Sequence, residues 1–312
     1  MPDVLISMMG LRKLPDWLPW SGEPPIMLEW AGVPTASGHP SWQRAARSLR
    51  GADGALLPNL FARFRQFLGF DLAQVGRIAA VGFSAGSNSG VRTLLESELD
   101  RARLDFVAAV DGMHPTLAVE QRGVHRPHSD DPRADFIAWD QQMGPFVAYA
   151  DAAAQGACAF VATASSVAPT RREISTTSQA LSALYAYVAQ AVGPSSPNLP
   201  ASFPPRADSP ALRQGEDYPA PYQVQGVGDF VAMWYPGDQR RDHVLQAAVV
   251  VPDILRAFLV PRWGGPSPGL VSSISEPSSA ATPPTVSGLP DCSGIALAVP
   301  AAVATVLARG ES

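Results

Sequence analysis

Three side chains in this sequence could together carry out nucleophilic chemistry. Ser84 lies within the pentapeptide GFSAG, Asp111 lies near the end of the run DFVAAVDG, and His243 follows the loop YPGDQRRD. A serine hydroxyl becomes a nucleophile when an imidazole takes its proton, and a carboxylate can hold that imidazole in the required tautomer. Each of the three follows an apolar stretch that predicts a buried strand. Because ligands bind at the carboxyl ends of strands in open parallel sheets, we expect the three at one edge.

Apolar runs alternate with helical patterns along most of the chain. Strands are expected at residues 3–10, 24–34, 77–83, 105–112, 158–166 and 229–237. Helices are expected at residues 55–69, 87–100, 134–155, 175–193 and 242–259. Continuous apolar strands separated by helices predict a parallel sheet that is covered on both faces. The expected fold class is therefore α/β, a three-layer α/β/α sandwich around a mainly parallel sheet of about six strands.

The domain organisation follows from composition. The chain has 312 residues, 46% of them hydrophobic, which is enough for one large domain, expected over residues 1–263. Loop insertions are expected at about 114–135 and 193–227. Residues 264–312 are rich in Pro, Ser and Gly and predict an extended tail.

The two ends of the sequence bear on location and partners. The first residues lack a positive region followed by a long apolar one, so no signal peptide is expected and a cytoplasmic location is favoured. The apolar run 294–308 contains Pro300 and is shorter than the ~20 residues that span a bilayer. We therefore expect the tail to pack or to dock on a protein partner, and membrane insertion is not expected.

Charge and motif content exclude several classes of function. The net charge is −5 and no basic stripe is present, so nucleic-acid binding is not expected. The segment GFSAGSNSG lacks both the lysine of a nucleotide-binding loop and the spacing of a dinucleotide-binding one. His114, His125 and His128 share a polar segment with several carboxylates, but their spacing fits no standard metal-ligand set. We expect no metal and no organic cofactor.

The segments VGFSAGSNSG and YPGDQRRDHVLQ together resemble the α/β-hydrolase superfamily of serine esterases, lipases and cutinases. The resemblance covers roughly residues 3–262, and Ser84, Asp111 and His243 follow in the chain order of that superfamily. It implies that Ser84 is the nucleophile on a tight strand-to-helix turn and that His243 is the general base. The implied activity is hydrolysis of a carboxylic ester, small or polymeric. An amidase or peptidase would use the same residues.

Simpler interpretations of these residues stay open. Ser84 could be a small residue in an ordinary strand-to-helix turn, and His243 could be a surface histidine at a helix start. The other histidines are less suitably placed as a base, His39 in an early loop and the remaining three in or beside the polar segment.

The carboxylate partner is less sharply defined. The superfamily usually places it after the strand at 158–166, where TASSVAPTRRE contains no aspartate and Glu173 is the first carboxylate. Asp111, one strand earlier, is the favoured acid, with Glu173, Asp238 and Asp242 as alternatives.

The resemblance also implies an oxyanion hole of two backbone N–H groups. Ala85, next to Ser84, is the first expected donor. Leu11 is the second, with Met9 as its alternative. The His-Gly pair that is usual in this loop is absent, since Met9 precedes Gly10. The irregular loop, the open choice of acid and the extended tail motivate a second hypothesis, a non-catalytic binding or structural protein on the same scaffold.

Overall fold

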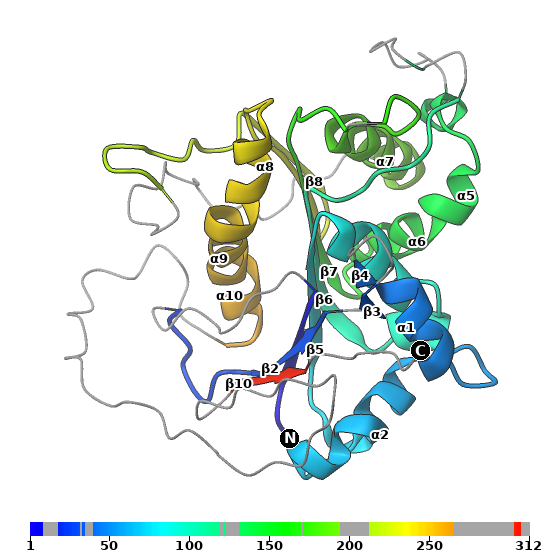
Figure 1. Ribbon diagram of the computed structural model, residues 1–312, viewed down its shortest axis with the longest axis vertical. Coiled ribbons are helices and arrows are strands. Elements are labelled where there is room, and N and C mark those ends of the chain that lie inside the picture. Colours follow the sequence, from blue (N-terminus) through cyan, green and yellow to red (C-terminus); the bar gives the residue numbers. More distant parts are fainter. Residues whose placement is uncertain are drawn as a thin grey trace.

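The computed structural model describes residues 1–8, 18–31, 33–34, 40–118, 122, 131–169, 171–193, 212–264 and 303–306. Within them, one large sheet crosses the molecule and carries helices on both faces (Figure 1). The predicted α/β class is therefore confirmed. Leu11 lies outside the described residues, as do Met9, His39, His125 and His128.

The sheet has eight strands in the order β10-β2-β1-β5-β6-β7-β9-β8. Their bounds are β1 Val4–Met8, β2 Ile26–Trp30, β5 Ile78–Phe83, β6 Leu104–Val110, β7 Ala159–Ala164, β8 Gln223–Val227, β9 Phe230–Trp234 and β10 Val303–Val306. All neighbours are parallel except β8, which runs antiparallel to β9. A separate two-stranded sheet pairs β3 (Val33–Pro34) with β4 (Pro40–Ser41).

The six predicted strands are present, and two more extend the main sheet. β8 lies at the end of the segment predicted as the loop 193–227, and β10 lies in the predicted tail, where it pairs with β2. The expected count of about six was therefore too low, because both additional strands lie at the edges of the sheet. The predicted division at residues 263 and 264 stays a prediction.

The strand ends are in register at the edge where the candidate residues lie. Phe83 at the end of β5 pairs with Val110 at the end of β6, and Val110 pairs with Thr163 of β7. Neighbouring strands lie about 4.8 Å apart, so residues that directly follow these ends can share contacts. This register positions the candidate site.

The helices divide between the two faces of the sheet. One face carries α1 (Trp42–Leu49), α2 (Leu57–Leu68), α5 (Trp139–Gln142), α6 (Gly144–Ala154) and α7 (Thr177–Val192), drawn to the right of the sheet in Figure 1. The other face carries α8 (Arg240–Leu245), α9 (Val251–Ile254) and α10 (Val260–Arg262). Shorter helical segments include α3 (Arg92–Leu95) and α4 (Glu98–Arg101).

Side-chain alternation along the strands produces two apolar cores. Val4, Ile6 and Met8 of β1 pack in one core with α1, α2, α6 and α7, and Leu5 packs in the other with the α8–α10 helix. Successive strand side chains point to opposite faces, so a strand that is buried on both sides is apolar at nearly every position. This explains the continuous apolar runs of the sequence.

The last helix is continuous from Arg240 to Arg262, with two π-helical stretches, Gln246–Val250 and Leu255–Leu259, between α8, α9 and α10. Among the described residues it is the one helix long and apolar enough to span a membrane, with a mean hydropathy of 1.7. However, 61% of that stretch is buried within the molecule. Its apolar side chains form part of the second core, which accounts for its composition.

Candidate active site

Ser84 lies on a sharp turn between β5 and a π-helical segment, Gly86–Val91. Its backbone is left-handed, with a φ of 53°. Such a conformation costs a residue with a Cβ atom about 1–2 kcal/mol. Hydrogen bonds hold the turn: the N–H of Ser84 donates to the Val110 carbonyl at 3.0 Å, and its carbonyl accepts from Ser87 and Asn88 at 3.0 Å each. The serine side chain therefore stands at the end of the strand, half-buried.

Three glycines permit this turn. A Cβ on Gly82 would lie 2.7 Å from the Gly86 backbone, and one on Gly86 would lie 1.6 Å from the Met8 carbonyl oxygen. A Cβ on Gly112 would lie 2.2 Å from the Ser84 carbonyl oxygen. No side chain fits at these distances, so glycine is required where the turn meets β1 and the end of β6.

His243 reaches the serine from α8 on the other side of the turn. Its Nε2 lies 2.9 Å from Ser84 Oγ, and its ring packs on Phe83 with the centroids 4.6 Å apart. Three residues further along the same helix, Gln246 Oε1 accepts a hydrogen bond from the hydroxyl of Thr163 in β7 at 2.7 Å. The position of the imidazole beside Ser84 is therefore fixed by its own helix and by the hydrogen bond from that helix to β7.

Asp111 holds the opposite nitrogen of that imidazole. Its Oδ2 lies 2.7 Å from His243 Nδ1, and the aspartate is fully buried just beyond β6, with a φ of 42°. Asp tolerates the left-handed conformation better than most residues. Because a carboxylate accepts, Nδ1 carries the proton and Nε2 faces Ser84 Oγ with its lone pair. The three predicted residues are thereby connected in the order Ser84, His243, Asp111.

The carboxylate of Asp111 receives three further hydrogen bonds. Ser165 donates its N–H to Oδ1 at 2.8 Å and its hydroxyl to Oδ2 at 2.6 Å, and the Thr177 hydroxyl donates to Oδ1. Burial would raise the pKa of Asp111, but the hydrogen bonds from His243, Ser165 and Thr177 outweigh it and hold the pKa below its usual value. Asp111 is therefore ionised at neutral pH. The sequence reasoning missed Ser165 and Thr177.

The other candidate acids have different contacts. Asp242 Oδ2 accepts from the backbone N–H of Gln239 at 2.9 Å, and Asp238 Oδ1 accepts from the Gln239 side chain at 2.7 Å. The backbone carbonyl of Glu173 accepts from Leu117 at 2.7 Å. Of the four candidates, Asp111 is the one with a hydrogen bond to His243 among the described contacts.

One of the two expected oxyanion donors lies within the described residues. Ala85 directly follows Ser84 and is exposed, at the start of the π-helical segment. Since β1 ends at Met8, paired with Gly82, the carboxyl end of β1 also lies beside the turn. Leu11 and its alternative Met9 are outside the described residues.

His114 lies near the same strand ends. Its Nδ1 is 3.2 Å from the Ser175 carbonyl oxygen, and its backbone N–H donates to Asn88 Oδ1 at 3.3 Å. Burial lowers the pKa of His114, and the Ser175 carbonyl and Asp111 only partly offset this effect. The ring is therefore neutral at neutral pH, with Nδ1 as the protonated nitrogen because a carbonyl only accepts.

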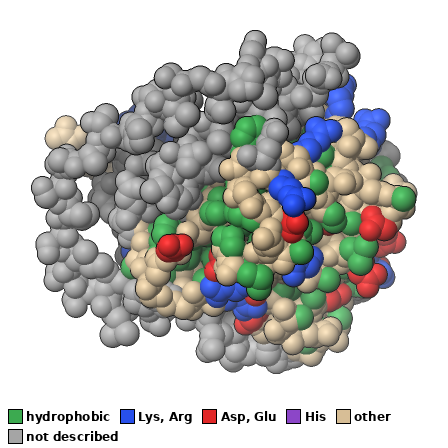
Figure 2. Space-filling model, turned by 90° about the horizontal axis from the view of Figure 1, so that it is seen from below, with side chains coloured by type: hydrophobic (Ala, Val, Ile, Leu, Met, Phe, Trp, Pro, Cys, Tyr) green, Lys and Arg blue, Asp and Glu red, His purple; other side chains and the backbone are tan. Residues whose placement is uncertain are grey.

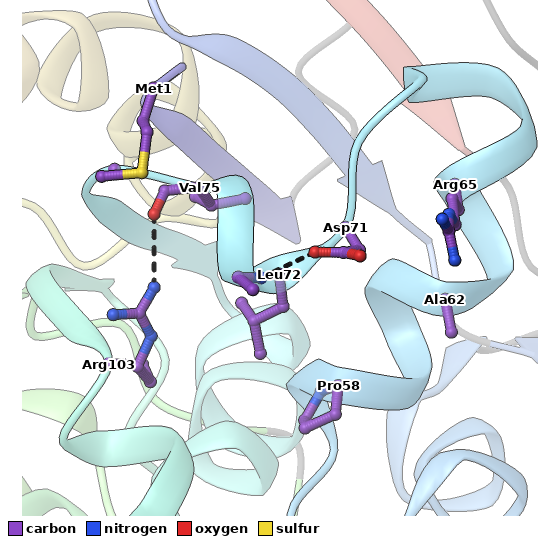
Figure 3. A pocket seen from close by; sticks show the side chains of 10 residues that line it. Met1, Pro58, Ala62, Arg65, Asp71, Leu72, Val75 and Arg103 are labelled. Carbon is purple, nitrogen blue, oxygen red and sulfur yellow. Dashed lines mark hydrogen bonds between the residues drawn. The ribbon is translucent and has the colours of Figure 1, made fainter.

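An open pocket of about 700 Å³ lies at the other end of the sheet (Figure 3). Met1, Val75 and Arg103 line it, and they come just before β1, β5 and β6. Ser84 and Asp111 follow the carboxyl ends of β5 and β6, so this pocket is separate from them. Figure 2, viewed from this end, shows acidic and basic side chains interspersed with apolar ones. Among the described residues, no group of three or more His, Cys, Asp or Glu side chains is placed to hold a metal ion.

Comparisons with known proteins identify no family for this chain: no family model matches it, and neither the curated proteins nor the solved structures include a significant match.

Proposed function

We propose that this chain is a serine hydrolase of the α/β-hydrolase type that cleaves carboxylic esters. The observation that carries the proposal is the continuous hydrogen-bond path from Ser84 Oγ through the two nitrogens of His243 to Asp111, with distances of 2.9 and 2.7 Å. The sheet order, the left-handed Ser84 and the close glycine contacts support it. Fold alone would not, because the same architecture also serves unrelated functions.

The geometry supports a two-step reaction. Ser84 Oγ attacks the ester carbonyl carbon while His243 Nε2 takes its proton, and the carbonyl π electrons move to the oxygen. In this mechanism the N–H of Ala85, the residue after Ser84, donates to the oxyanion. When the carbonyl re-forms, the alcohol leaves with the proton from Nε2, and an acyl group stays on Ser84. Water, deprotonated by His243 Nε2, then attacks the acyl carbon. The bond from the acyl carbon to Ser84 Oγ breaks, Oγ takes the proton back from Nε2, and the carboxylic acid is released.

Asp111 contributes without exchanging a proton. Its negative charge, 2.7 Å from Nδ1, stabilises the imidazolium that forms in each step and keeps Nδ1 protonated. The bonds that hold its pKa low keep the carboxylate available for this role. Phe83 packs beside the imidazole, with the ring centroids 4.6 Å apart and the planes tilted by 36°, and this contact supports the orientation of the ring.

The test is labelling by a fluorophosphonate probe together with hydrolysis of p-nitrophenyl acetate. We expect the wild type to be labelled and to hydrolyse the ester, and Ser84→Ala and His243→Ala to lose both activities. Ser48→Ala, which removes an exposed hydroxyl whose hydrogen bond among the described contacts lies within α1, is the matched control and should behave as the wild type. A folded wild-type protein that is neither labelled nor active would refute the proposal and favour a binding or structural role. A matched p-nitroanilide substrate separates esterase from amidase activity.

A further inference from the structure

The carboxylate of Asp111 is surrounded by donors from three different elements. His243 approaches from α8, Ser165 from the end of β7, and Thr177 from the start of α7. Ser165 donates both its N–H and its hydroxyl, which makes four bonds in all, and each Asp111 oxygen accepts two of them. Resting on the proposed function, we propose that Ser165 and Thr177 are positioning residues, whose hydroxyls hold the Asp111 carboxylate in the orientation that accepts from His243.

Ser165 fixes the plane of the carboxylate. Its backbone N–H donates to Oδ1 at 2.8 Å, and its hydroxyl donates to Oδ2 at 2.6 Å, the oxygen that also accepts from His243. A pair of donors from one residue to both oxygens prevents rotation about the Asp111 Cβ–Cγ bond. Both residues are buried, with exposed fractions of 1% or less, so water cannot replace these bonds.

Thr177 adds a second hydroxyl from another element. It is the first residue of α7, a 16-residue helix whose N-terminal capping box is formed by Thr176 and Gln179. Its hydroxyl donates to Oδ1 and lies 3.1 Å from the Ser165 carbonyl oxygen. A single hydroxyl proton serves one acceptor at a time, and the carboxylate is the stronger one. The positive end of the helix dipole also favours a negative charge at this point.

A purely structural role for Thr177, in starting α7, is the alternative to be separated. The helix-capping hydroxyl is that of Thr176, which accepts from the Gln179 N–H at 3.1 Å. Thr177→Val keeps the shape of the side chain, leaves this cap intact and removes only the hydroxyl that meets Asp111. The titratable groups that interact electrostatically with Asp111 are His243, His114 and Tyr218. The substitution alters none of these side chains.

The experiment compares Thr177→Val with Thr177→Ser and with Thr93→Val. Thr93 is a buried threonine of α3 whose hydroxyl has no hydrogen-bond partner among the described contacts, so it controls for the loss of a buried hydroxyl. We expect Thr177→Val to lower kcat for p-nitrophenyl acetate on the order of tenfold, as for one bond to a charged group. Thr177→Ser should recover most of the rate, and Thr93→Val should stay at the wild-type rate.

The pH profile distinguishes positioning from packing. A carboxylate that has lost a donor holds the imidazolium more strongly, so the acid limb of kcat/KM should move to higher pH in Thr177→Val and stay in place in the control Thr93→Val. Ser165→Ala should move it in the same direction. An unchanged rate and acid limb in a stably folded Thr177→Val protein would overturn the proposal, as would a Thr177→Ser variant no better than Thr177→Val.

A second measurement keeps this inference separate from the proposed function. In the wild type and Thr177→Val, the carboxyl carbon of Asp111 is titrated by NMR, which needs no turnover. The pKa should rise by about one unit in the variant. If the wild type is inactive and unlabelled, the proposed function fails while this titration still decides the positioning role. A pKa unchanged by the substitution would overturn that role.

Discussion

Asparagine in place of Asp111 keeps the size of the side chain and its tolerance of a left-handed backbone, but it removes one acceptor. Four donors meet the carboxylate: the Ser165 N–H and the Thr177 hydroxyl at Oδ1, and the Ser165 hydroxyl and His243 Nδ1 at Oδ2. An amide has one oxygen and one NH2 group, so it cannot accept from all four.

The Ser165 N–H determines how the amide turns. A backbone N–H cannot become an acceptor, so the asparagine oxygen must take the Oδ1 position beside it. The NH2 group then faces His243, which can pair with it only through an unprotonated Nδ1. The neutral imidazole would carry its proton on Nε2, directed at Ser84 Oγ, and could not take the serine proton. The substitution therefore inverts the tautomer while the heavy atoms stay in place.

The expected effect of Asp111→Asn is a loss in kcat on the order of 10⁴ for p-nitrophenyl acetate, the size associated with a wrong tautomer. The assay is steady-state hydrolysis, with thermal unfolding to establish that the variant is folded. Activity within tenfold of the wild type in a folded variant would refute the reasoning, because it would mean that another group holds Nδ1 protonated.

Two further predictions concern the turn and the acid. Gly86→Ala should abolish cooperative folding or cost several kcal/mol, since its Cβ would lie 1.6 Å from the Met8 carbonyl oxygen, whereas Gly144→Ala, with nothing within 4 Å, should be neutral or slightly stabilising; equal denaturation midpoints would contradict this. The pKa of Asp111 is depressed in the folded state, so its contribution to stability is present above the unfolded pKa and lost as pH falls through the folded one. The difference in unfolding free energy between wild type and Asp111→Asn should therefore shrink as pH falls below about 4, and a constant difference in urea titrations would count against it.

The buried strands were predictable because burial on both faces leaves a continuous apolar run. Edge strands lack that signal. Gln223 of β8 is exposed, and β8 follows a proline-rich segment, so its sequence QVQGV indicated a loop. α1 was missed although its signal was present: Trp42, Ala45 and Leu49 are buried at helical spacing after the N-cap Ser41.

The helix after Ser84 shows what periodicity cannot predict. One helix was expected over residues 87–100, but the structure has a π-helical stretch, then α3, and a new start at α4 with Ser97 as N-cap. The close approach of Gly86 to β1 is a tertiary constraint. No local pattern reports it, although the glycines that allow it were visible.

The choice of acid depended on contacts between neighbouring strands. Because β6 and β7 are adjacent and in register, a side chain just beyond either strand can reach the same space beside His243. Carboxylates at both ends would repel each other, and one would be forced to take up a proton. When the carboxylate follows β6, a neutral hydrogen-bond donor is therefore favoured after β7. Ser165 occupies that position, and both its N–H and its hydroxyl donate to Asp111. The absence of aspartate from TASSVAPTRRE, which left the acid open in the sequence, is thus consistent with Asp111 as the acid of the proposed triad. Two serines begin that loop after β7, and the first of them completes the carboxylate site.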